Sequence, residues 1–294
     1  MQNVRFTLTY LLPSMLRGLA IPLPFWAEVA TRFDTDTAVR PAGEGVFEAR
    51  ISSDWFIGPQ PNGGYVAAIV LRAMVATVDD ASRPPRSYTV HLLRPAAEGP
   101  VRVSVTVERS GRTVSTLSAR LEQDGRLIAV GLCAFGVGRG GDLEFADASM
   151  PSVPPPSAVE PRPFEERHIA FRQQFDNRWV IGEDGSGEVA RTGAWLRLAE
   201  GQPLDAVVVT QLMDCWMPSV FVKATERGTV HGPNVPTIEL TVHFREPLPL
   251  PDDHYLGVFH TDVARDGFLV EDGRLWAPDG RLVADSRQLA IMAF

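Results

Sequence analysis

Runs of alternating hydrophobic and polar residues make up most of the chain, and they fall into two sets of five. Alternation over about four to eight residues is typical of a half-buried β-strand, because successive side chains point to opposite faces of a sheet. The first set predicts strands over Val46–Ile51, Ser87–Arg94, Val101–Arg109, Thr113–Gln123 and Arg126–Phe135. The second set predicts strands over Val189–Leu198, Thr237–Arg245, Tyr255–Val263, Phe268–Trp276 and Arg281–Met292.

Each set contains one longer apolar stretch, which lies between its first and second strands. Gly63–Val78 follows Asn62, a residue type that caps helices, and we expect a helix there. Leu204–Trp216 occupies the same place in the second set. Its run Val207–Val209 is β-branched and would also suit a strand. We predict a helix because the stretch matches the position of the first one.

The two sets are related by an internal repeat. Tyr88–Pro95 matches Leu240–Pro247 at an offset of 152, and Asp124–Ala129 matches Asp279–Ala284 at an offset of 155. An Asp-Gly pair begins each of the latter segments and predicts a tight hairpin turn. A strand, a long helix and then an antiparallel meander predict an α+β fold in which the sheet wraps the helix, the hotdog fold. Two copies in one chain predict a double hotdog.

The composition changes sharply at two places. Residues 138–163 contain three glycines and six prolines, which exclude a helix or a central strand, so we expect a linker between domains 27–137 and 164–294.

Residues 1–26 are rich in apolar side chains but are interrupted by Pro13, Arg17, Pro22 and Pro24. They lack the unbroken apolar core and cleavage site of a signal peptide. We expect a poorly ordered extension or a start codon placed too early.

Charge and cysteine content narrow the class of partner. The 294 residues include 28 basic and 36 acidic side chains, a net charge of −8, which argues against nucleic acid as the main partner. No stretch approaches about 18 uninterrupted apolar residues, so no integral membrane segment is expected.

The two cysteines, Cys133 and Cys215, lie in apolar runs. We interpret them as buried thiols that pack in the core of a protein from a reducing compartment, and we expect a cytoplasmic protein.

Common catalytic motifs are missing from the sequence. It has no Gly-x-Ser-x-Gly elbow and no P-loop, and the glycines at 136–141 run into prolines rather than opening a helix. The six histidines lack the spacing of zinc ligands. We therefore expect neither a metal nor a cofactor.

Two polar residues within apolar elements are the candidates for chemistry. Asp214 comes at the end of the predicted second helix, where it is either a general base or a helix-end carboxylate that reaches solvent. Gln288 lies on the small, apolar face of the strand Arg281–Met292, and must find hydrogen bonds there or bond to backbone. The offset of 155 maps it onto Cys133. Polar groups in only one copy predict one active site, with the other site lost.

Asn62, Gly63 and Gly64 open the first helix. Glycines there let a ligand approach backbone N–H groups that the helix leaves unpaired, which suits an oxyanion or a phosphate. A tight turn from strand to helix would explain them equally well.

These motifs, taken in order, resemble those of the type II (TesB-like) acyl-CoA thioesterases over roughly residues 27–294. The resemblance rests on Asn62–Tyr65, Leu93–Pro95 and the turn at Asp124 in the first half. In the second half it rests on Trp195–Arg197, Asp214, Pro236–Ile238, Phe244–Pro247 and Asp285–Gln288. It implies that Asp214, Thr237 and Gln288 hold the water that attacks acyl-CoA. It also implies a homo-oligomer, because hotdog proteins often pair across sheet edges.

The mechanism implied is direct hydrolysis, with Asp214 taking a proton from water and amides near Gly63 and Gly64 stabilising the oxyanion. Two alternatives remain: a catalytically silent acyl-CoA-binding protein, and an enoyl-CoA hydratase of the same fold. Hydratases of this fold pair an Asp with a His in the loop and helix region, but no histidine lies between residues 169 and 230.

Overall fold

The computed structural model describes residues 30–161, 170–182, 188–226 and 235–292. The predictions for residues 1–26 lie outside this part of the chain. None of the helices in the described ranges has the length and apolarity needed to cross a membrane.

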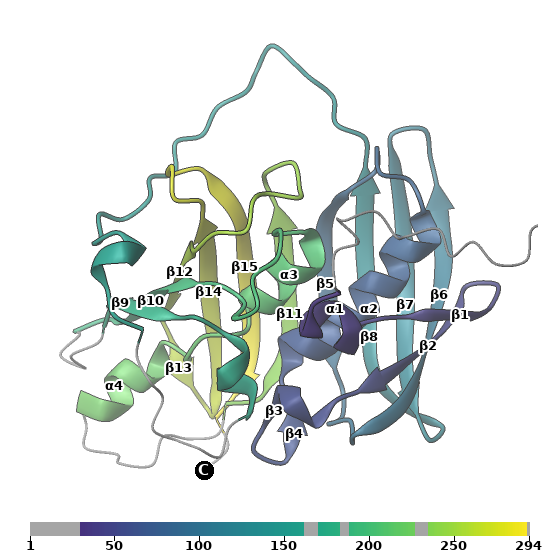
Figure 1. Cartoon of the computed structure of the whole chain (residues 1–294), viewed down its shortest axis with the longest axis horizontal. Coiled ribbons are helices and arrows are strands. Elements are labelled where there is room, and N and C mark those ends of the chain that lie inside the picture. Colours follow the sequence, from purple (N-terminus) through teal and green to yellow (C-terminus); the bar gives the residue numbers. More distant parts are fainter. Residues whose placement is uncertain (1–29, 162–169, 183–187, 227–234, 293–294) are drawn as a thin grey trace, which may run out of the picture. The chain divides into compact units, whose positions relative to one another are not determined.

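One large antiparallel sheet of thirteen strands runs through the described residues (Figure 1). The first half of the chain contributes β1 Arg40–Gly43, β2 Val46–Ile51, β5 Pro85–Leu92, β6 Gly99–Ser110, β7 Val114–Gln123 and β8 Arg126–Gly136. The second half contributes β9 Arg178–Ile181, β10 Ala190–Leu196, β11 Thr237–Phe244, β12 Tyr255–Thr261, β13 Ala264–Arg265, β14 Phe268–Trp276 and β15 Leu282–Ile291. The order is β1-β2-β6-β7-β8-β5-β11-β15-β14-β12-β10-β9, and β13 pairs with β14. All ten predicted strands are present, with ends shifted by up to two residues.

The two halves meet where β5 pairs with β11. Val90 lies opposite Leu240 in this pairing, and the hydroxyls of Thr89 and Thr241 are 2.8 Å apart. The backbone ladder therefore continues from one half into the other.

Helix α2 (Gly63–Val78) has the predicted bounds and packs against one face of the first-half strands (Figure 1). The Asn62 side chain caps it by accepting a hydrogen bond from the Tyr65 N–H at 3.0 Å. Ten of its residues are buried, because strands cover one side and helix α3 (Ala206–Leu212) covers another. A helix enclosed in this way is apolar around most of its circumference.

Helix α3 is shorter than predicted, so the expected helix Leu204–Trp216 is wrong at both ends. Leu204 forms a backbone bridge with Leu250, and Asp205 caps the helix by accepting from the Val208 N–H at 2.7 Å. At the other end the Asp214 N–H bonds to the Gln211 carbonyl, three residues back, which tightens the last turn. Asp214 therefore lies in a turn after the helix rather than on it.

Several short elements lack a periodic pattern and were not predicted. They are α1 Arg32–Asp36, α4 Val220–Glu226, the hairpin of β3 Phe56–Ile57 and β4 Gln60–Pro61, and the 3-10 turns Ser53–Trp55, Pro156–Ala158 and Ala170–Gln174. Strands β1, β9 and β13 are also additional to the prediction.

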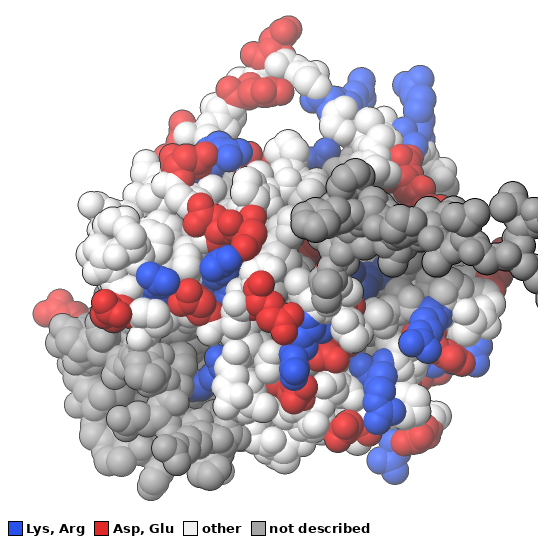
Figure 2. All heavy atoms as spheres, viewed as in Figure 1, with Lys and Arg blue, Asp and Glu red and all other residues white. Residues whose placement is uncertain are grey.

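Residues 138–161 contain no helix or strand apart from the turn Pro156–Ala158 (Figure 1). The end of this segment is tied to the second half: Arg178 Nη1 donates to the Pro156 carbonyl at 2.6 Å, and Trp195 Nε1 donates to the Pro154 carbonyl at 2.8 Å. On the face shown in Figure 2, the acidic and basic side chains of the described residues are interspersed.

Candidate active site

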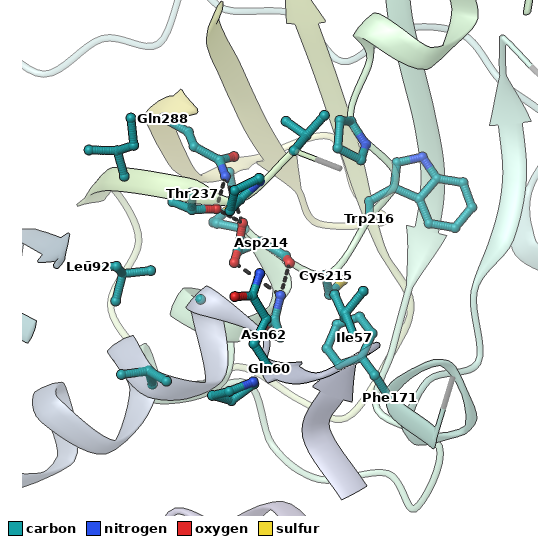
Figure 3. Close-up of a pocket in the computed structure, with 18 of the residues that line it drawn as sticks. Ile57, Gln60, Asn62, Leu92, Phe171, Asp214, Cys215, Trp216, Thr237 and Gln288 are labelled. Atoms are coloured by element: carbon teal, nitrogen blue, oxygen red, sulfur yellow. Dashed lines mark hydrogen bonds between the residues drawn. The ribbon is translucent and has the colours of Figure 1, made fainter. Parts of the chain in front are cut away.

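Asp214 lies at the centre of a hydrogen-bonded cluster beside the N-terminus of α2 (Figure 3). Its Oδ2 accepts from the Gly64 N–H at 2.6 Å and from Asn62 Nδ2 at 3.1 Å. Its Oδ1 accepts from Gln288 Nε2 at 2.9 Å and from the Thr237 hydroxyl at 3.1 Å. Four donors therefore surround one carboxylate, and they come from both halves of the chain.

Strand register explains how Gln288 reaches this cluster. Ala284, Ser286, Gln288 and Ala290 are buried on β15, as the alternation in the sequence predicted, and Val283 on the other parity is buried as well. Gln288 is 9% exposed and lies opposite Leu240 of β11. Its amide also donates to the Thr237 hydroxyl, so the two side chains form one unit with the carboxylate.

Thr237 reaches the same cluster because of an irregularity in β11. Simple alternation places Thr237 on the face opposite Leu240. The pairing with β15 shifts between Thr237 and Glu239, so that one residue is extra on the β11 side. Such a bulge reverses the facing of the residues beyond it. Thr237 therefore lies opposite the buried Ala290 and faces the cavity.

The environment of Asp214 suits a general base. Burial raises the pKa of its carboxyl from 3.8 to about 6, while hydrogen bonds from Gly64, Thr237 and the two amides favour the ionised form and oppose this rise. A carboxyl with a pKa near 6 is mostly ionised at neutral pH yet basic enough to take a proton from water.

Gly64 differs from its expected role, because its N–H donates to Asp214 instead of facing the substrate. The glycine is needed for close approach, since a Cβ at position 64 would lie 2.9 Å from Asp214 Cβ. A Cβ at Gly63 would lie 2.9 Å from Asp214 Oδ2 and 2.7 Å from Leu92 Cδ1. Both glycines thus bring the helix end against the carboxylate.

Glu271 is a second buried carboxyl that the sequence analysis missed. It is 7% exposed and lies directly opposite Gln288 in the β14–β15 pairing. Its Oε2 accepts from the Ser219 N–H at 2.6 Å, and burial raises the pKa of its carboxyl to about 7. The alternation in the sequence could have identified it, because Glu271 interrupts the apolar row formed by Leu269 and Leu275 on the predicted strand.

A cavity of about 430 Å³ opens beside this cluster (Figure 3). Asp214, Thr237, Gln288 and Glu271 line it. Its apolar walls come from both halves and include Leu92, Phe171, Met213, Trp216, Phe221 and Phe259. An apolar cavity with a few converging polar groups is typical of a small-molecule site. Within the described ranges, no group of three or more His, Cys, Asp or Glu side chains is arranged to hold a metal ion.

Solved structures place this architecture in the hotdog class. A hot-dog-fold protein of unknown function from Alicyclobacillus acidocaldarius is 27% identical, with a TM-score of 0.82 over 90% of this chain and 99% of that one. A candidate thioesterase II from Thermobifida fusca is 26% identical, with a TM-score of 0.79 over 90% and 99% of the two chains. An uncharacterized Mycobacterium tuberculosis H37Rv protein is 26% identical over 88% of this chain and 98% of its own.

Family models identify the class more narrowly. Residues 51–136 match the acyl-CoA thioesterase N-terminal domain, and residues 151–292 match the acyl-CoA thioesterase C-terminal domain. The chain therefore belongs to the acyl-CoA thioesterase family and is a thioester hydrolase.

Proposed function

We propose that the protein hydrolyses acyl-CoA to a free fatty acid and CoA, with Asp214 as the general base. The observation that carries this proposal is the Asp214 carboxylate itself. Its pKa is raised to about 6, and it is held by four donors at the wall of an apolar cavity.

In the proposed step, a water molecule beside Asp214 attacks the thioester carbonyl carbon while Asp214 takes one of its protons. Gln288 and Thr237 orient the carboxylate, because both donate to Oδ1. The family resemblance gives them the further role of holding that water. The carbonyl oxygen gains negative charge near the N-terminus of α2, where the Gly63 amide is the candidate donor. The tetrahedral intermediate then expels the thiolate of CoA, which receives the proton from Asp214.

The domain organisation is part of the proposal. We assign residues 27–137 and 164–294 to one hotdog domain each, joined by residues 138–163, so that the whole is a double hotdog. The matching strand pairs support this division, because β8–β5 and β15–β11 share one register at an offset of 152 to 155 residues.

A role in fatty acid metabolism, a cytoplasmic location and a homo-oligomeric state complete the proposal. The oligomeric state rests on the family resemblance, since hotdog proteins often pair across sheet edges. Light scattering of the purified protein tests the oligomeric state.

The decisive experiment compares Asp214→Asn with the wild type on a panel of saturated acyl-CoAs and enoyl-CoAs. We expect the wild type to release free thiol, and the Asn variant to fold and lose that activity by about two to four orders of magnitude. Asp285→Asn is the matched control, because Asp285 also lies on β15 but, among the described residues, pairs with Arg245 at the surface and not with the Asp214 cluster. Loss of enoyl absorbance without thiol release would indicate a hydratase. Tight binding with neither change would indicate a silent acyl-binding protein.

A further inference from the structure

The Asn62 side chain is held in one orientation by the groups on either side of it. Its Oδ1 accepts from the Tyr65 N–H at 3.0 Å, and its Nδ2 donates to the carbonyl and to Oδ2 of Asp214 at 2.8 and 3.1 Å. A backbone N–H can only donate, and a carboxylate can only accept. A reversed amide would therefore lose the helix cap and place oxygen against the Asp214 carboxylate.

Gln211 supplies a second donor to the same oxygen. It lies on α3, is fully buried, and its Nε2 donates to Asn62 Oδ1 at 2.9 Å. Its own Oε1 is enclosed without a hydrogen-bond partner among the described residues. An unpartnered buried oxygen costs stability, so an apolar side chain here would suit the core better. The equivalent position in α2, six residues after the cap, is the apolar Ala68.

We propose that Gln211 is a positioning residue for hydrolysis. By donating to Asn62 Oδ1, it keeps Asn62 Nδ2 directed at Asp214 and so keeps the carboxylate ionised and oriented. This inference rests on the proposed role of Asp214 as the general base.

Gln211→Met tests the proposal, because methionine has a similar length but cannot donate. We expect the variant to retain or gain thermal stability, since the unpartnered oxygen is removed. We expect kcat/KM for acyl-CoA to fall about tenfold, the scale of one hydrogen bond. The low-pH limb of the kcat/KM profile should move to higher pH, because loosening Asn62 weakens a bond that favours the ionised carboxylate.

The matched control is Thr210→Val on the neighbouring residue. Thr210 is equally buried, but its hydroxyl donates only to the Ala206 carbonyl within the helix. If Gln211 only packed in the core, Gln211→Met and Thr210→Val would both change thermal stability, and neither would shift the pH profile of kcat/KM. Asn62→Ser keeps a capping oxygen and removes the amide, so it should shift the pH profile of kcat/KM in the same direction as Gln211→Met. The double variant Asn62→Ser/Gln211→Met should shift this profile no further than Asn62→Ser alone.

Gln211→Glu is a second test that preserves size. Glutamate donates only while protonated, so this variant should lose activity relative to the wild type as the pH rises. A wild-type pH profile and kcat/KM in both Gln211→Met and Gln211→Glu would overturn the inference. Asp214→Asn, assayed alongside, separates the two claims: an active Asn variant would reject the proposed base itself, whatever Gln211 does.

Discussion

Gln288 and Cys133 occupy equivalent places in the two halves of the sheet. Gln288 lies between Leu240 and Glu271, whereas Cys133 lies between Tyr88 and Leu117. The first half thus has a thiol and an apolar side chain where the second half has an amide and a carboxyl. Tyr88 and Cys133 are both fully buried.

Gln288→Met should lower the kcat for thiol release by about a hundredfold, the scale of losing one donor at a reacting centre. The variant keeps the side-chain length, so folding should be preserved. Cys133→Ala is the control from the first half: it should cost about 1 kcal/mol of stability through a small cavity and leave kcat unchanged. Equal losses of kcat in both variants would contradict the assignment of one active half.

The rate of thiol release should depend on pH through Asp214. Its carboxyl has a pKa of about 6, and only the ionised form accepts a proton, so kcat/KM should fall below pH 6 and reach a plateau above pH 7. Steady-state rates between pH 5 and 8 check this. A flat profile over that range would exclude Asp214 as the base.

Gly63→Ala should reduce activity strongly, because its Cβ would lie 2.9 Å from Asp214 Oδ2 and must displace the carboxylate. We expect a loss of at least about tenfold in kcat, in line with the sensitivity of catalysis to small displacements. Gly140→Ala is the control, since a Cβ there has no neighbour within 4 Å. Retention of full activity by Gly63→Ala would show that this close approach is unnecessary.

Glu271 should make the folded state less stable at high pH. Burial raises the pKa of its carboxyl from 4.5 to about 7, so the fold favours the protonated form. Its contribution to stability is present below pH 4.5 and is lost as the pH rises through 7, by about 3 kcal/mol in total. Asp214 contributes with the same sign.

Glu271→Gln should remove this dependence while keeping an acceptor for the Ser219 N–H. Urea unfolding at pH 5 and pH 8 measures the effect. The wild type should lose more stability than the variant between the two pH values. An identical loss of stability in both proteins would show that groups other than Glu271 cause the pH dependence.

Much of the fold follows from local sequence patterns. Alternation predicted ten of the thirteen strands in the described sheet. An apolar run after a capping Asn predicted both ends of α2. The end of α3 was not predictable in this way, because it depends on contacts of Leu204 with Leu250 and of Asp214 with the other half. Short elements such as α1 and α4 contain too few residues for a period to show.

The site was predictable in part. Asp214 and Gln288 stand out as polar residues in apolar surroundings, and Glu271 carries the same signal on its strand. Thr237 was reached only through the family resemblance, because the bulge after it reverses the facing that alternation predicts. Gln211 is a helix residue whose importance depends on a contact 149 positions away in the sequence.

The pairing of β5 with β11 has a consequence for substitutions in either half of the chain. Because Asp214 comes from the second half and two of its donors, Asn62 and Gly64, come from the first, a substitution in either half can change the hydrogen bonding of this one carboxylate. A loss of activity therefore need not map to the half of the chain that carries Asp214, because a change at Asn62 or Gly64 in the first half removes a donor from the same carboxylate.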